Sequence, residues 1–146
     1  MKYTTLKTLA IFGLFFMLAA ASVHAQSANK ISATVPFDFT AGDAKLKAGE
    51  YKIRRDDMQM LVVTSADQKT RAFVLAPKTV RRTRSDGSEK LVFHRHGNQY
   101  FLAEVWISRG TDGNGLYISA AERRLMKDLA KTEAGPERIE IVARKK

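Results

Sequence analysis

Apolar and polar residues alternate along much of the chain after position 30, which is the pattern of β-strands that bury one face and expose the other. Segments rich in Gly, Ser and Asp separate these runs and indicate turns. The pattern predicts strands at 31–39, 50–55, 58–65, 70–76 and 78–84, with connecting loops at 40–49 and 109–115. Because no helix is expected between these strands, parallel crossover units are excluded and an antiparallel arrangement is predicted.

The longest strand-like run, 90–108, is interrupted by Gly97-Asn98, a dipeptide that suits a two-residue hairpin turn. Counting outward from this turn pairs residues 93–96 with 99–102 and, further along, Leu91 with Glu104. Each face of the hairpin then carries large apolar side chains, with Phe93, Leu102 and Trp106 on one face and Val92, Phe101, Val105 and Ile107 on the other. Because both faces need to be covered, we expect this hairpin to be central.

Ser119 and Glu122 have the spacing of a capping box, in which each side chain accepts a hydrogen bond from the backbone N–H of the other residue. They predict a helix that begins at Ser119 and ends before Gly135-Pro136. Docking of this helix onto the sheet is favoured over a membrane surface, because its apolar stripe is narrow and lacks aromatics: Ala121, Leu125, Met126 and Leu129. A short strand is expected afterwards, around 139–142.

Together these elements predict a single β-rich domain at 26–146, whose last few residues form a basic tail. The expected fold class is mainly β: a small antiparallel sandwich or barrel of six to eight strands, with one C-terminal helix packed against it. The sequence contains no cysteine, so its stability must come from packing. Thiol nucleophiles and thiolate metal sites are excluded for the same reason.

The first residues have the composition of a secretory leader. Lys2 and Lys7 flank the start of an apolar run at 9–21, and Val23-His24-Ala25 then places small residues where signal peptidase requires them. The run is shorter than the roughly 20 apolar residues that a membrane-spanning helix needs. We therefore expect a signal peptide at 1–25, cleavage after Ala25, and an exported protein that is periplasmic or extracellular, with no transmembrane segment in the mature chain.

The full chain carries a formal net charge of +10. Its basic residues form three clusters: Lys78, Arg81, Arg82 and Arg84; Arg123, Arg124, Lys127 and Lys131; and the tail Arg144-Lys145-Lys146. If these clusters were adjacent, they would attract anionic envelope polymers or lipid headgroups. The simpler interpretation is a charged surface that keeps the protein soluble. No aromatic residues are interleaved with the clusters, so specific binding of nucleic acid is not expected. The oligomeric state is left open.

His94 and His96 lie two positions apart on one predicted strand, so their rings project to the same face, which is workable spacing for metal ligands. The mature chain has no other histidine, and the register above places Glu104 on the opposite face. Lys90 and Arg95 would add positive charge nearby. We therefore predict no metal site and no cofactor.

Catalytic signatures are also weak. No Gly-x-Ser-x-Gly elbow accompanies the histidines, so a serine–histidine–acid triad is not indicated. Asp112-Gly113-Asn114-Gly115 begins like a calcium loop, but Leu116, Tyr117 and Arg123 stand where the template needs an acid or amide, a glycine and a glutamate. We predict no catalytic residue and no enzyme, while the ligand-binding residues stay unknown.

Three stretches are distinctive as strings: Val35-Pro36-Phe37-Asp38-Phe39, Ala48-Gly49-Glu50-Tyr51, and the hairpin strands 91–97 and 100–106. They resemble segments of small, exported, uncharacterised proteins of the kind found in acidobacteria. These are hydrophobic strand motifs and carry no catalytic residues. The resemblance therefore implies export and one compact domain, and it implies no activity or ligand.

These observations support two hypotheses about function. The leading hypothesis is an exported, non-catalytic β-domain with a binding or structural role in the cell envelope or outside it, where it contacts anionic polymers. The alternative is a carrier that holds a small apolar ligand in a barrel interior, with a cavity lined by Phe93, Phe101, Leu102 and Trp106.

Overall fold

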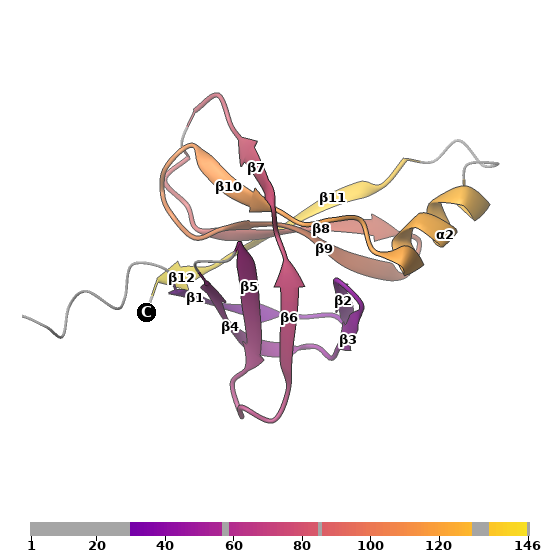
Figure 1. Cartoon of the computed structure of the whole chain (residues 1–146), viewed down its shortest axis with the longest axis horizontal. Helices are drawn as coiled ribbons and strands as arrows, with labels where there is room; N and C mark the ends of the chain where they lie inside the picture. The colour runs from indigo at the N-terminus through magenta and orange to yellow at the C-terminus, as the bar shows by residue number, and fades with distance from the viewer. Residues whose placement is uncertain (1–29, 57–58, 85, 130–134, 146) are drawn as a thin grey trace, which may run out of the picture.

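In the described part of the chain, two β-sheets pack against each other and one helix lies beside them (Figure 1). The computed structural model describes residues 30–56, 59–84, 86–129 and 135–145. The predicted leader at 1–25 lies outside the described residues. In the part of the chain that the structure describes, the strands form two sheets rather than one closed barrel. The predicted fold class, a mainly β sandwich with one helix, is confirmed, but the described residues form twelve strands and not the six to eight that were expected.

The first sheet has the strand order β12-β1-β4-β5-β6, and all its neighbours are antiparallel. Its strands are β1 (Lys30–Val35), β4 (Gly49–Arg55), β5 (Met60–Ser65), β6 (Arg71–Leu75) and β12 (Arg144–Lys145). The first strand is shorter than the predicted 31–39 because it ends at Val35, directly before Pro36, which has no N–H to donate to a neighbour.

The second sheet has the order β11-β8-β9-β10-β7, and β2 pairs with β3 and, in parallel, with β9. Its strands are β2 (Phe39–Ala41), β3 (Ala44–Leu46), β7 (Lys78–Arg81), β8 (Lys90–His96), β9 (Gln99–Trp106), β10 (Asp112–Gly115) and β11 (Glu137–Val142). The β8–β9 hairpin has partners on both sides. Its predicted central position is therefore confirmed.

The hydrophobic core fills the space between the two sheets. The first sheet contributes Ile31, Val35, Ile53, Leu61 and Val63, and the second contributes Leu91, Phe93, Leu102 and Val105. Phe93 is completely buried, and its ring makes edge-to-face contacts with Phe37 and Phe39. Burial of a side chain of this size contributes roughly 1.5–3 kcal/mol to folding.

Two segments that were predicted as loops contain short strands. Residues 40–49 include most of the β2–β3 hairpin, which turns at Gly42 with a φ of 60°. Residues 109–115 include β10, which pairs with both β7 and β9. The prediction was wrong here because glycines weaken strand propensity, although Gly113 is needed for packing. A Cβ atom on Gly113 would lie only 2.6 Å from Trp106 Cδ2.

The predicted register of the β8–β9 hairpin is confirmed near its turn and wrong farther away. Phe93 pairs with Leu102 as expected, but Val92 pairs with Glu104. Ala103 is therefore an extra residue on β9, which is a β-bulge. A bulge has no clear compositional signal, so counting residues from the turn could not reveal it.

This bulge changes which residues face the core. A one-residue shift moves every later side chain of the strand to the other face of the sheet. Val105 therefore joins the core, whereas Glu104 and Trp106 lie on the outer face together with His94 and His96. The predicted placement of Glu104 opposite the histidines is wrong.

The helix α2 (Ala120–Leu129) covers part of this outer face. The Ser119 hydroxyl accepts a hydrogen bond from the N–H of Glu122 at 3.1 Å, which confirms the predicted N-cap. Leu125 and Leu129 of the predicted stripe are only half-buried. Among the residues of α2 that the structure describes, Glu122 alone is buried. The helix thus docks on the sheet through an acidic side chain.

Candidate metal-binding site

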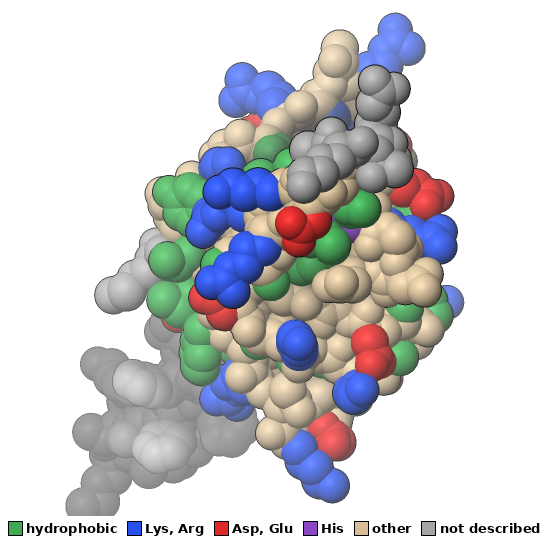
Figure 2. Space-filling view, turned by 90° about the vertical axis from the view of Figure 1, so that its right-hand side faces the viewer, with side chains coloured by type: hydrophobic (Ala, Val, Ile, Leu, Met, Phe, Trp, Pro, Cys, Tyr) green, Lys and Arg blue, Asp and Glu red, His purple; other side chains and the backbone are tan. Residues whose placement is uncertain are grey.

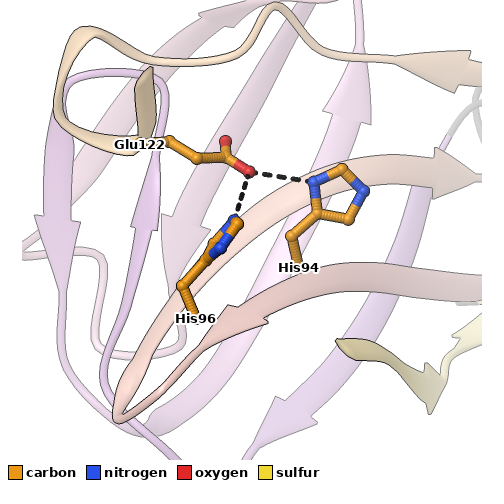
Figure 3. Close-up of side chains that lie close together, drawn as sticks. All are labelled: His94, His96 and Glu122. Atoms are coloured by element: carbon orange, nitrogen blue, oxygen red, sulfur yellow. Dashed lines mark hydrogen bonds and ion pairs between the residues drawn. The ribbon is translucent and has the colours of Figure 1, made fainter. Parts of the chain in front are cut away.

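Three side chains converge where α2 meets the outer face of the second sheet: His94 and His96 of β8, and Glu122 of α2 (Figure 3). The Glu122 Oε1 atom lies 2.9 Å from His94 Nδ1 and 3.2 Å from His96 Nε2. The candidate ligand atoms of the three residues all lie within 4.8 Å of one another. One carboxylate oxygen therefore contacts both imidazole rings.

Local structure explains this convergence. His94 and His96 point to the same face because side chains alternate along a strand. Their ring planes are nearly perpendicular, at 89°. The cap at Ser119 starts α2 just before Glu122 and places that side chain in the first turn, against the sheet. Gly97 takes a φ of 60° at the first position of the turn that ends β8, as a tight hairpin requires.

The site is buried on one side and accessible on the other. The exposed fraction of the side chain is 2% for His96, 4% for Glu122 and 30% for His94. Burial by itself raises the pKa of Glu122, but the hydrogen bonds from His94 and His96 outweigh this effect and hold that pKa below its ordinary value. The carboxylate is therefore anionic and available to a cation.

The donor atoms fit a divalent transition-metal ion. Imidazole nitrogen and carboxylate oxygen are ligands that zinc, iron, nickel and copper accept. Two ligands at about 2.1 Å from one ion lie about 3.4 Å apart in tetrahedral geometry, so the most widely separated donors need to approach each other by about 1.5 Å. When the facing imidazole nitrogens carry protons, they donate to Glu122, and a metal ion would replace those protons.

Glu122 is the candidate ligand that the sequence pattern did not reveal. Its spacing from Ser119 assigned it to a reciprocal capping box, but its carboxylate reaches His94 and His96. A signal was present in the helix pattern, because Glu122, Leu125 and Leu129 fall on one helical face. An acid at the end of an apolar stripe indicates a buried polar partner.

The two basic residues near the histidines, Lys90 and Arg95, form ion pairs with acidic residues in the structure. Lys90 binds Asp86 and Glu140, at 2.8 Å and 2.9 Å. Arg95 lies on the opposite face of β8 from the histidines, where it binds Glu137. The positive charges that were expected to repel a cation are therefore paired with acids, and one of them faces away.

Glu104 belongs to a second polar network on the same face. It forms two ion-pair contacts with Arg138, at 2.8 Å and 3.0 Å, and accepts a hydrogen bond from Trp106 Nε1 at 2.9 Å. Burial raises the pKa of Glu104, but these hydrogen bonds outweigh it and hold the pKa below its ordinary value. Glu104 is thus an anion that its neighbours already neutralise.

The segment 112–115, which partly resembles a calcium-binding loop, stabilises the second sheet. Asp112 binds Arg81 at 2.9 Å, and Asn114 Nδ2 donates to the backbone carbonyl of Val105 at 3.2 Å. These contacts connect β10 to β7 and β9.

The three basic clusters lie on different elements. The first is on and after β7, the second on α2 and the third on β12, and Figure 1 places these elements at separate parts of the molecule. Lys131 and Lys146 lie outside the described residues. On the face that includes α2, Lys and Arg side chains are interspersed with acidic and hydrophobic ones (Figure 2). The clusters therefore do not merge into one basic surface in the part of the chain that is described.

The residues proposed for an apolar carrier cavity are divided between the two faces of the second sheet. Phe93 and Leu102 pack in the core, whereas Phe101 contacts His96 on the outer face. Trp106 lies under the Arg82 guanidinium, 4.6 Å from the ring centroid. The described residues thus form two packed layers at this point and do not line a common interior.

Comparison of the chain with protein-family models, with curated proteins and with solved structures finds no match. Among the described residues, no helix has both the length and the hydropathy to cross a bilayer. The resemblance to exported acidobacterial proteins therefore stays a prediction, and the function must be inferred from the site itself.

Proposed function

We propose that this protein is an exported, non-catalytic β-domain that binds a divalent transition-metal ion through His94, His96 and Glu122. The observation that carries the proposal is the burial of Glu122 against two imidazoles at an otherwise weakly apolar helix contact. Buried charges in proteins are paired or coordinate metal ions. A helix that needed only to cover the sheet would be docked more favourably by an apolar residue at this position.

The chemistry of the three ligands favours zinc among the common ions. Two imidazoles and one carboxylate form a ligand set that zinc accepts with tetrahedral geometry, leaving a fourth position for another ligand. Calcium and magnesium prefer oxygen ligands alone. Because the chain has no cysteine, it offers no thiolate that would select a softer ion such as Cu⁺.

A binding role is favoured over hydrolysis because, among the described residues, the site shows no carboxylate or imidazole beyond the candidate ligands that is available as a base. The nearby carboxylate of Glu104 is held by Arg138 and Trp106. Activation of a metal-bound water usually requires a carboxylate or imidazole that is free to take its proton. The support for export is the sequence pattern that predicts a leader at 1–25, and an exported protein would act in the periplasm or outside the cell. Contact with anionic polymers is a separate expectation on which this proposal does not depend.

The proposal is tested by calorimetric titration of the exported chain, purified without a polyhistidine tag, with ZnCl₂ and CoCl₂. We expect one ion per chain, with a dissociation constant of about 1 µM or lower. Glu122→Gln keeps the side-chain shape and removes the anionic ligand, so it should weaken binding by at least about tenfold to a hundredfold. Bound Co²⁺ should also give the visible absorption of a low-coordinate site.

Asp128→Asn is the matched control, because it removes the same charge from an exposed position of the same helix. It should bind zinc as the wild type does. Circular dichroism of both variants checks that α2 is still folded. Equal zinc affinity in Glu122→Gln and Asp128→Asn, or no saturable binding to the wild type, would show that the His–Glu–His cluster is only a structural hydrogen-bond network.

A further inference from the structure

A small cavity adjoins the candidate metal site. Its volume is about 190 Å³, and His94 and Glu122 are among the residues that line it. This volume is below the roughly 300–1,000 Å³ of pockets that hold drug-sized molecules. The cavity therefore admits only a small molecule, and such a molecule would lie directly beside the proposed metal ligands.

The rest of the cavity wall is mostly apolar. It includes five aliphatic residues, which come from β7, from β9 and from the segment between β10 and α2: Val80, Leu102, Ala103, Leu116 and Ile118. Aliphatic walls do not supply the hydrogen-bond donors that phosphate or sulfate require for all their oxygens. They suit a molecule that has one polar end and a short hydrocarbon tail.

The charged groups that face the cavity determine whether the polar end of the bound molecule should be an anion or a cation. Lys78 and Glu104 line it together with Glu122. Arg138 neutralises Glu104, and the Lys78 ammonium lies 5.5 Å from the centroid of the Tyr117 ring. A divalent ion would more than cancel the charge of Glu122. With the ion in place, the cavity would carry net positive charge and attract an anion.

We propose that this cavity binds a short aliphatic monocarboxylate, whose carboxylate completes the coordination of the metal ion while its tail contacts the apolar wall. The inference rests on the proposed function, because it uses the coordination position that three protein ligands leave open. Lys78 supplies a second positive charge near the carboxylate. The site is thus a receptor for a small organic acid, and its affinity depends on the bound metal.

The test uses the exported chain loaded with Co²⁺ and titrated with sodium butyrate. Binding at the metal should change the visible absorption of Co²⁺, with a dissociation constant of about 1 mM. Butyramide has the same tail without the charge and should leave the spectrum unchanged. Acetate should bind more weakly than butyrate, because it lacks the methylene groups that contact the wall.

Two variants separate the charge from the apolar wall. Lys78→Gln should weaken butyrate binding by about threefold to tenfold without changing the affinity for Co²⁺. Lys45→Gln, on β3, removes an equivalent exposed charge away from this cavity and should have no effect. Val80→Thr keeps the shape of the wall but adds a hydroxyl group, and it should reduce the preference for butyrate over acetate.

The possible outcomes distinguish this inference from the proposed function. If Co²⁺ does not bind to the wild type, the metal site itself is wrong. If Co²⁺ binds and butyrate leaves its spectrum unchanged, only the carboxylate site is wrong. Phosphate binding as tight as butyrate binding, or equal losses in Lys78→Gln and Lys45→Gln, would also overturn the assignment of this cavity to an aliphatic carboxylate.

Discussion

The two faces of the β8–β9 hairpin are both buried, but they are buried in different ways. The inner face carries Leu91, Phe93 and Leu102 into a continuous hydrophobic core. The outer face carries His94, His96 and Glu104, which are covered by charged partners from α2 and β11. The inner face is therefore closed by apolar packing alone, whereas the outer face combines buried apolar residues with hydrogen-bonded charges and is partly accessible at His94.

This contrast indicates which face of the hairpin is the better candidate for a binding site. Burial of apolar side chains favours folding without any specific partner, so the contribution to stability is enough to explain the inner face. Burial of a carboxylate against imidazoles has a desolvation cost that hydrogen bonds only offset. The outer face, where this desolvation cost arises, is therefore the better candidate for a binding role. The bulge at Ala103 places Glu104 on the same face.

The largest expected effect comes from the inner face. Phe93→Ala removes a fully buried ring that contacts Phe37 and Phe39, so it should lower the free energy of unfolding by about 3–5 kcal/mol. Urea denaturation monitored by Trp106 fluorescence measures this change. Phe73→Ala, at an exposed position, is the control. Similar losses in the two variants would mean that the inner face is not a tightly packed core.

A smaller effect is expected where β10 supports the outer face. Gly113→Ala would place a methyl group within van der Waals overlap of the Trp106 ring and should cost about 1–3 kcal/mol. The emission spectrum of Trp106 should change as well, because the ring must move. Gly135→Ala meets no atom within 4 Å and serves as the control. Unchanged stability in Gly113→Ala would contradict the close packing of Trp106 on β10.

The smallest effect concerns the pH dependence of the free energy of unfolding, to which Glu122 on the outer-face site contributes. The pKa of Glu122 is lower in the folded protein than in the unfolded chain, so its contribution to stability is present above the unfolded pKa of about 4.3 and is lost as pH falls through the folded pKa. Metal-free Glu122→Gln should therefore lose less stability than the wild type between neutral pH and acid. Urea denaturation at a series of pH values measures the difference, and parallel curves would refute it.

Much of the fold could be predicted because its signals are local. Gly97-Asn98 determined the turn and the pairing as far as Leu102, and Ser119 marked the start of α2. β10 was missed because a glycine-rich segment has little strand propensity of its own and is held in the sheet by β7 and β9. The bulge at Ala103 was missed because its position depends on contacts with the neighbouring strands.

The sequence pointed to two of the three candidate ligands, although no metal site was predicted from them. His94 and His96 could be identified as a pair because strand periodicity is a short-range property. Glu122 could not be joined to them, since it lies 28 and 26 positions away in the sequence and meets them only when α2 docks on the sheet.

Local patterns were enough to predict the strand-rich fold, the central hairpin and the capped helix, because alternation and turn residues act over a few neighbouring positions. Long-range packing sets which face each side chain of β9 occupies beyond the bulge, and which acid meets the two histidines. Both depend on how distant segments pack, and a single inserted residue or the docking of one helix changes the answer without a local signal.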